Sequence, residues 1–274
     1  MISNRDTLIA ALGAGVTSTW SNVFLNGGHG TGPYNMGSSW LNSHRRGVIP
    51  ASFNVPAVCN AATLGGIPLT TLGAGFNWYL GAFNQSTNSA NSEIILFDRL
   101  AQVKINSSGG GSATFSMTRP ARSTTAVGVM AYAESLGGTT AGAAWPTITV
   151  TYTNSDGVAS RSGTIGGATA NFGANPGQML PMKLATGDRG VSSVQAVAFS
   201  AGVTSVGMIL HLSRALSATY APQIGTGLQR GYYELGGVAL GVDPCLFTAG
   251  NLTVGGGATG SGGVQQGSIR LISG

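Results

Sequence analysis

A hairpin pattern across residues 145–165, WPTITVTYTNSDGVASRSGTI, constrains the fold more than any other feature of the chain. Ile148, Val150 and Tyr152 alternate with threonines, and this period of two is typical of a strand with one buried face. The tetrapeptide NSDG at 154–157 supplies turn residues, and a second run of small β-forming residues follows it. The pattern therefore predicts two antiparallel strands that carry no group suited to catalysis.

Short alternating runs recur throughout residues 93–216. They predict strands at 93–105, 113–118, 127–132, 191–200 and 203–213. Four residues of the last run are expected on one face: Val206, Met208, Leu210 and Leu212. Turns rich in Gly, Ser and Asn separate the runs, and no segment of helical length interrupts them. The sequence predicts an all-β protein built on an antiparallel β-sandwich of jelly-roll or Greek-key type.

Four regions are expected along the chain. Residues 1–58 are predicted to form a short helix at 3–12 and then an extended arm, and residues 59–92 a Gly-rich connection. Residues 93–216 form the β-sandwich core, and residues 217–274 form a Gly-rich C-terminal segment with an edge strand at 265–273. Aromatic residues in the arm need a surface that buries them, on this chain or on a partner.

Charged residues are scarce, at 8% of the chain against about 25% in ordinary domains. Glycine is abundant, with 45 residues among 274, but it follows no Gly-X-Y repeat, and a collagen-like helix is excluded. A free monomer generally relies on charge for its solubility. A surface so poor in charge suits a subunit covered by neighbours, and we expect a homo-oligomer, with a trimer as one arrangement.

The positive net charge does not indicate a nucleic-acid-binding protein. The charge of +5 is spread along the chain, its longest run is Arg45-Arg46, and no direct nucleic-acid contact is expected. Residues 1–20 lack the basic and apolar regions of a signal peptide, so neither export nor membrane insertion is expected. Cys59 and Cys245 are accordingly interpreted as two buried thiols in preference to a disulfide.

Candidate reactive groups are few and dispersed. GGHGTG at 27–32 lacks the helix, lysine and acidic residue of a phosphate-binding loop, and we interpret it as a plain Gly-rich loop. The sequence has no Gly-x-Ser-x-Gly motif at a strand-to-helix turn that could pair a nucleophilic serine with His29, His44 or His211. Because His211 alternates with leucines, it is expected to face solvent or a neighbouring chain. The eight acidic residues share no motif. We expect no enzymatic activity, no cofactor and no metal site.

Residues 187–190, Gly-Asp-Arg-Gly, are predicted to form a tight turn that enters a strand at Val191. Asp188 would accept a hydrogen bond from the backbone ahead of it, which leaves Arg189 to project outwards. An ion pair between subunits is the alternative interpretation of Arg189.

Several of these segments together resemble virion structural proteins of tailed bacteriophages. The residues that carry the resemblance are 98–100, 149–157, Arg161, 163–165, 187–191, 193–195 and the apolar strand 208–212. The resemblance covers under half of the chain and includes neither terminal segment. It implies a capsid-associated or other auxiliary virion protein with β-sandwich geometry and symmetric copies, and it transfers no catalytic residue.

The residue patterns and the resemblance favour the same function. We expect a structural virion protein, a capsid decoration, cement or other head-associated protein, assembled in the bacterial cytoplasm and located in the virion. Its expected partners are copies of itself and other virion proteins such as the major capsid protein. The candidate interface residues are Tyr34, Trp40, Arg45, Arg46, Phe53, Arg189, Tyr232 and Tyr233.

A receptor- or carbohydrate-binding virion protein of a head fibre, neck or tail is the alternative. A jelly roll is a common host for such a site, and its signature would be an exposed aromatic platform beside Asn, Asp or Gln. Trp78-Tyr79 and Tyr232-Tyr233 are the candidates for this platform.

Overall fold

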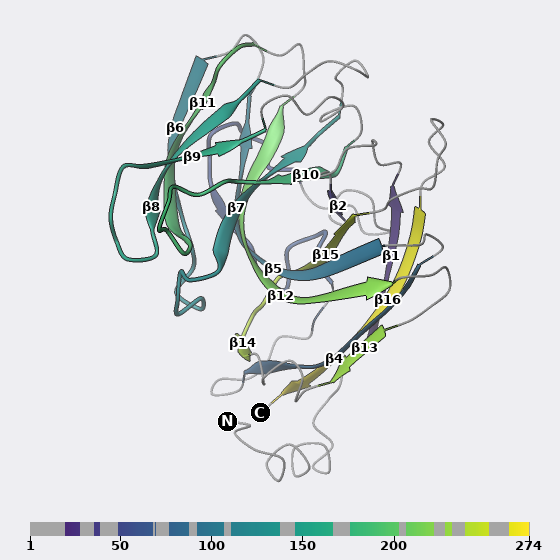
Figure 1. Ribbon diagram of the computed structural model, residues 1–274. Coiled ribbons are helices and arrows are strands. Elements are labelled where there is room, and N and C mark those ends of the chain that lie inside the picture. The colour runs from purple at the N-terminus through teal and green to yellow at the C-terminus, as the bar shows by residue number, and fades with distance from the viewer. Residues whose placement is uncertain are drawn as a thin grey trace.

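A computed structural model gives the arrangement of strands drawn in Figure 1. The structure describes residues 20–27, 36–38, 49–67, 69, 77–87, 92–106, 111–137, 146–166, 176–202, 207–221, 228–231, 239–251 and 263–273. Within these ranges every regular element is a β-strand, and the paired strands run antiparallel. The predicted all-β class and antiparallel sandwich are confirmed.

The strands form three sheets. The first has the order β1 (Trp20–Gly27), β16 (Gly263–Ser273), β4 (Trp78–Thr87) and β13 (Leu228–Gly231), and β14 (Ala239–Gly241) also pairs with β4. The second has the order β12 (Met208–Ala221), β7 (Val129–Ser135), β10 (Gln178–Pro181), β2 (Met36–Ser38), β15 (Leu246–Asn251), β5 (Ser92–Ile105) and β3 (Ala57–Val58). The third has the order β6 (Gly111–Thr118), β11 (Val191–Phe199), β8 (Ile148–Asn154) and β9 (Arg161–Ile165).

The predicted hairpin forms as β8 and β9. Tyr152 pairs with Arg161, and residues of β8 alternate between buried and half-buried, with Val150 and Tyr152 on the buried side. The Asn154 side chain holds the turn, because its Oδ1 accepts the backbone N–H groups of Asp156 and Val158. Alternation and turn chemistry therefore identified this element correctly.

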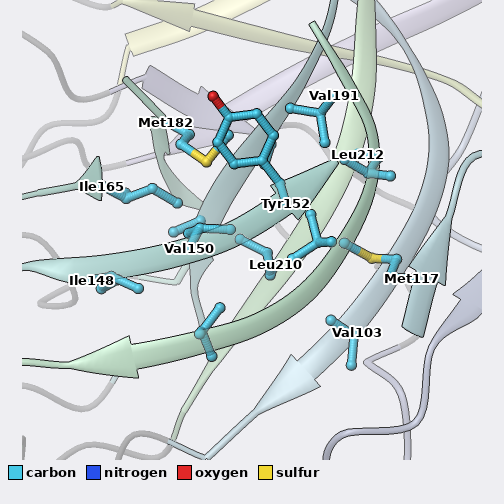
Figure 2. Close-up of a cluster of buried hydrophobic side chains, with 14 of the residues drawn as sticks. Val103, Met117, Ile148, Val150, Tyr152, Ile165, Met182, Val191, Leu210 and Leu212 are labelled. Atoms are coloured by element: carbon cyan, nitrogen blue, oxygen red, sulfur yellow. The ribbon is translucent and has the colours of Figure 1, made fainter. Parts of the chain in front are cut away.

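The third sheet packs against one end of the second sheet and encloses the largest apolar cluster. In Figure 2, Leu210 and Leu212 of β12 lie between Tyr152 of β8 and Met117 of β6, and Val103 of β5 belongs to the same cluster. The prediction that alternate residues of β12 share one face is thereby confirmed for those at 208, 210 and 212, and Val206 lies outside the described residues.

The first sheet packs against the other end of β5 and β12. This second cluster joins Trp78, Leu80 and Phe83 of β4 and Ile269 and Leu271 of β16 to Ile94, Leu96 and Leu216. Because β5 and β12 pair along their whole lengths, from Ile105–Met208 to Ser92–Ala221, each strand takes part in both clusters. The protein is thus two sandwiches that share one sheet (Figure 1).

The shared second sheet closes on itself. β12 pairs with β7 on one side and β5 on the other, and β2 joins β10 to β15, so the order β12-β7-β10-β2-β15-β5 forms a closed ring. Phe97, Tyr132, Met179 and Phe247, from four of these strands, form a third cluster. Their side chains lie on the face opposite to the other two clusters, inside the ring.

The terminal regions contribute strands to the chain's own sheets. The strand expected at 265–273 forms as β16, but it lies between β1 and β4 rather than at an edge, because β1 pairs with it from Trp20–Arg270 to Gly27–Gly263. β1 and β2 both come from the region expected to form an arm. The helix expected at 3–12 lies outside the described residues.

Candidate functional site

The predicted interface residues fall mostly outside the described part of the chain. This applies to six of them: Tyr34, Trp40, Arg45, Arg46, Tyr232 and Tyr233. It applies also to His29 and His44. The structure describes Phe53 and Arg189, and it places them on different elements, Phe53 beside β5 and Arg189 in the turn before β11.

Phe53 belongs to a strip of exposed apolar side chains around β3, which we call the 49–64 strip. It comprises Ile49, Phe53, Val55, Val58 and Leu64, with exposed fractions of 41, 40, 56, 59 and 49%. Among the other residues whose side-chain burial the structure describes, only Val127, Val158 and Val242 are large, apolar and comparably exposed. Within that set, most of the large exposed apolar side chains lie on one short segment, of which the sequence patterns identified only Phe53.

Backbone pairing with β5 fixes this strip in place. Asn54 N donates to the Lys104 carbonyl oxygen at 2.8 Å, β3 pairs with β5, and Cys59 N donates to the Leu100 carbonyl oxygen at 3.0 Å. The ammonium of Lys104 lies 4.4 Å from the centroid of the Phe53 ring, within the range of a cation–π interaction. Among the described strands β3 pairs with β5 alone, so it is an edge strand.

Asp188 ties the predicted turn to the hairpin through side chains, not through the backbone ahead of it as we expected. Its carboxylate accepts hydrogen bonds from the Tyr152 hydroxyl, from Asn154 Nδ2 at 2.8 Å and from Arg161 Nε at 3.0 Å. These bonds, that of Arg161 first, hold the pKa of Asp188 at about 2. The carboxylate therefore stays ionised at neutral pH and holds three elements together.

Arg189 projects outwards as expected, with 64% of its side chain exposed, and its partner lies in the same chain. Its Nη2 donates to Asp156 Oδ1 at 2.9 Å, and Ser155 N donates to the Gly190 carbonyl oxygen at 2.9 Å. Six of the residues that carry the phage resemblance thus meet in one cluster: Tyr152, Asn154, Asp156, Arg161, Asp188 and Arg189. Their bonds fix two turns to each other.

The closed ring holds a buried ion pair that no sequence pattern indicated. Arg99 Nη1 lies 2.8 Å from Glu134 Oε2, and both side chains have an exposed fraction of 0%. The pairing of β5 with β12 shifts register at Leu100, so Arg99 lies opposite Ser213 and faces inwards. The Arg99 guanidinium also lies 5.5 Å from the centroid of the Phe247 ring.

His211 is completely buried beside this pair, and the prediction that it faces solvent or a neighbouring chain is wrong. Its Nδ1 lies 2.8 Å from Ser213 Oγ, its Nε2 lies 3.9 Å from Glu134 Oε2, and its ring stacks on Tyr132 with centroids 5.5 Å apart. The physical reason is that β12 is covered on both faces, by the third sheet outside the ring and by opposite strands inside it. Burial also raises the pKa of Tyr132 to about 12.

Ser213, His211 and Glu134 are the residue types of a nucleophile, a base and an orienting carboxylate. Their geometry differs from such a triad, because 3.9 Å between His211 Nε2 and Glu134 Oε2 exceeds hydrogen-bond distance. All three residues are wholly buried, and a substrate would reach Ser213 only if the ring opened. We therefore interpret this cluster as a structural polar core. The described residues contain no group of three His, Cys, Asp or Glu suited to a metal ion.

Acidification is expected to destabilise the fold through His211. Burial, and then the nearby Arg99 charge, hold the pKa of His211 well below 6.5, so the unfolded chain binds a proton here that the folded chain does not. The free energy of unfolding should therefore fall by about 1.4 kcal/mol per pH unit as the pH drops below roughly 6.5. Urea unfolding of wild type and His211→Gln between about pH 7 and 5 measures this, and equal pH slopes would contradict it.

The aromatic platform proposed for carbohydrate binding is not present at Trp78-Tyr79. These residues are 0% and 4% exposed, because β4 packs against β5 and β12 and is paired on both sides. Tyr232-Tyr233 lies outside the described residues. No described segment is a helix of the length and apolar character that a membrane span requires.

Comparison with known proteins gives weak structural likenesses. No protein-family model matches the sequence, and a search of curated proteins finds no match. The chain is similar to a crystal structure of the infectious bursal disease virus VP2 subviral particle, at 10% identity over 94% of this chain and 80% of that chain, with a TM-score of 0.21. A structure of the Gx strain of that virus gives 10% identity over 94% and 81%, with a TM-score of 0.22.

Proposed function

We propose that this chain is a structural virion protein of a tailed bacteriophage, of the capsid decoration, cement or head-associated auxiliary type. It would bind the assembled particle and stabilise it, as one of many symmetric copies in contact with the major capsid protein and with each other. The observation that carries this proposal is the 49–64 strip. The bacteriophage source and the decoration role come from the sequence resemblance.

The 49–64 strip has the composition of a contact surface. Five large apolar side chains are between 40 and 59% exposed on a stretch of 16 residues, in a chain with only 8% charged residues. Fully burying such a side chain stabilises a contact by about 1.5–3 kcal/mol, and symmetric repetition multiplies this gain over the particle. The edge strand β3 also offers backbone groups for pairing with a strand of a neighbour.

The rest of the described chain suits a rigid support for this surface. The shared sheet is closed and covered on its outer face by two other sheets. The six clustered residues of the phage resemblance fix turns to strands, so we assign them a structural role. A protein that resists deformation while it clamps neighbouring subunits needs such a body, and the proposed function involves no chemical reaction.

Substitution of two strip residues tests the contact. Val55→Thr with Val58→Thr keeps side-chain shape but places two hydroxyls in a dry interface, and we expect binding to particles to weaken by about 100-fold. The matched control is Val127→Thr with Val158→Thr, at valines of similar exposure elsewhere on the surface. Co-sedimentation with particles that lack the protein measures both. Equal binding by the two double variants would contradict the proposed contact.

Point substitutions are preferable to deletion of residues 1–58. Such a deletion would remove β1 and β2, and with β2 the link between β10 and β15 that closes the ring. Loss of particle binding would then follow from unfolding as readily as from a lost contact. Val55 and Val58 are exposed, so their replacement leaves all three apolar clusters unchanged.

A further inference from the structure

Cys59 and Cys245 meet at one edge of β5, although they are far apart in the sequence. Cys59 N donates to the Leu100 carbonyl oxygen at 3.0 Å, and the Cys245 carbonyl oxygen accepts Arg99 N at 2.8 Å. Because Arg99 and Leu100 are consecutive, the end of β3 and the start of β15 abut along the same strand. Both thiols are reduced and buried, as the sequence predicted, and they form a hydrogen bond with each other.

An ion pair with 10% of the arginine and 1% of the aspartate side chain exposed holds the backbone of both cysteines in position. Arg122 Nη1 lies 2.5 Å from Asp98 Oδ2, and Arg122 Nη2 donates to the Cys59 carbonyl oxygen at 3.1 Å. The other carboxylate oxygen, Asp98 Oδ1, accepts Cys245 N at 3.0 Å. One arginine and one aspartate therefore hold the backbone segments of both cysteines next to each other.

We propose that Cys59 and Cys245 are an oxidation site that forms a reversible intramolecular disulfide with a small disulfide such as oxidised glutathione. The Cys59 thiolate attacks one sulfur of the reagent, forms a mixed disulfide and releases one glutathione thiolate. Cys245 then loses its proton and attacks the Cys59 sulfur, which forms the Cys59–Cys245 bond and releases the second glutathione. Two protein thiols are oxidised, and one reagent disulfide is reduced to two thiols. This proposal does not depend on the proposed virion function.

The surroundings assign Cys59 as the first sulfur to react. Cys59 belongs to the third apolar cluster, but it directly follows Val58, which is 59% exposed in the two-residue edge strand β3. Local opening of this edge is therefore the step that would expose Cys59. Burial would raise the pKa of Cys59, but the Cys245 hydrogen bond and the charges of Arg99 and Arg122 outweigh it and lower the pKa. Burial, and then the bond to Cys59, raise the pKa of Cys245. Cys245 is therefore the resolving thiol.

Intact mass after thiol labelling tests the disulfide. Folded full-length protein is incubated with oxidised glutathione, denatured and alkylated, and we expect loss of both labels from the monomer. As a control, the protein is denatured before it is incubated with oxidised glutathione, which tests whether the reagent oxidises exposed thiols under these conditions. Two labels on the folded protein together with oxidation of the denatured control would overturn the proposal, and so would a disulfide between two molecules.

Single serine variants test the order of reaction. Cys245→Ser should accumulate one glutathione adduct on Cys59, because the resolving thiol is absent, whereas Cys59→Ser should stay unmodified under the same conditions. An adduct on Cys59→Ser but not on Cys245→Ser would overturn the assigned order. The disulfide should raise the thermal midpoint of the wild type by about 5–10 °C, since it joins segments that are distant in sequence, and the midpoint of the unmodified Cys59→Ser should not change. An unchanged thermal midpoint after complete oxidation would contradict the predicted stabilisation by the disulfide.

Discussion

Replacing Glu134 by Ala is expected to lower the free energy of unfolding by about 3–5 kcal/mol. The substitution removes the carboxylate that lies 2.8 Å from Arg99 Nη1, and both side chains are wholly buried inside the ring. The Arg99 charge would then lie in a low-dielectric interior without its counter-ion, next to a histidine that burial keeps neutral. Equilibrium unfolding in urea measures the loss, and a change below about 1 kcal/mol would contradict this view of the ring.

Two further variants separate charge from packing. Asp156→Ala removes the partner of Arg189 at the surface, where the side chains are 64 and 49% exposed, and it should cost at most about 1 kcal/mol. Replacing both members of the buried pair, as Arg99→Met with Glu134→Leu, should cost less than Glu134→Ala alone, because no unpaired charge remains. A double variant as unstable as Glu134→Ala would show that packing, not charge, dominates at this position.

Replacing Gly190 by Ala should destabilise the protein by about 3 kcal/mol or more. A Cβ at this position would lie 2.0 Å from the Ala126 carbonyl oxygen and 3.1 Å from Gly128 N, so the two backbone segments would have to separate. Overpacking against movable side chains typically costs about 1–3 kcal/mol, and backbone atoms yield less readily. The hydrogen bond from Ser155 N to the Gly190 carbonyl oxygen would be strained as well.

Gly187 provides a matched control within the same turn. A Cβ there meets nothing within 4 Å, but the φ of +88° is unfavourable for other residues, so Gly187→Ala should cost only about 1 kcal/mol. Thermal unfolding of both variants distinguishes a steric clash from backbone strain. Equal losses of stability in the two variants would contradict the view that the close approach of residues 126–128 requires glycine at position 190.

Much of the fold could be predicted from sequence because the strands of the third sheet have one buried face. In β8, Val150 and Tyr152 are buried while the threonines between them are half-exposed, and the period of two is visible at once. Ring closure could not be predicted, because β5 and β12 are buried on both faces. Polar residues in these strands therefore do not indicate a solvent-exposed face. His211 was misplaced for this reason, and the inward turn of Arg99 follows from a register shift that leaves no sequence signal.

The candidate site was predictable only in part. Phe53 was identified as an isolated aromatic. Val55 lies between Pro50 and Pro56, and Val58 lies two residues after Pro56, a pattern that indicates a loop. Pro56 directly precedes β3, and proline at the start of a strand is characteristic of a sheet edge, so this signal could have indicated an exposed edge strand with apolar side chains. The meeting of Cys59 and Cys245 depends on two segments pairing with the same edge of β5, which spacing alone does not reveal.

The number of copies per particle tests most directly whether this chain functions as a repeated subunit on a capsid. Quantitative mass spectrometry of density-purified particles, with the major capsid protein as internal standard, measures this number. Decoration predicts on the order of hundreds of copies, in fixed ratio to the capsid symmetry. Absence from the particles, or a few dozen copies or fewer, would contradict this role.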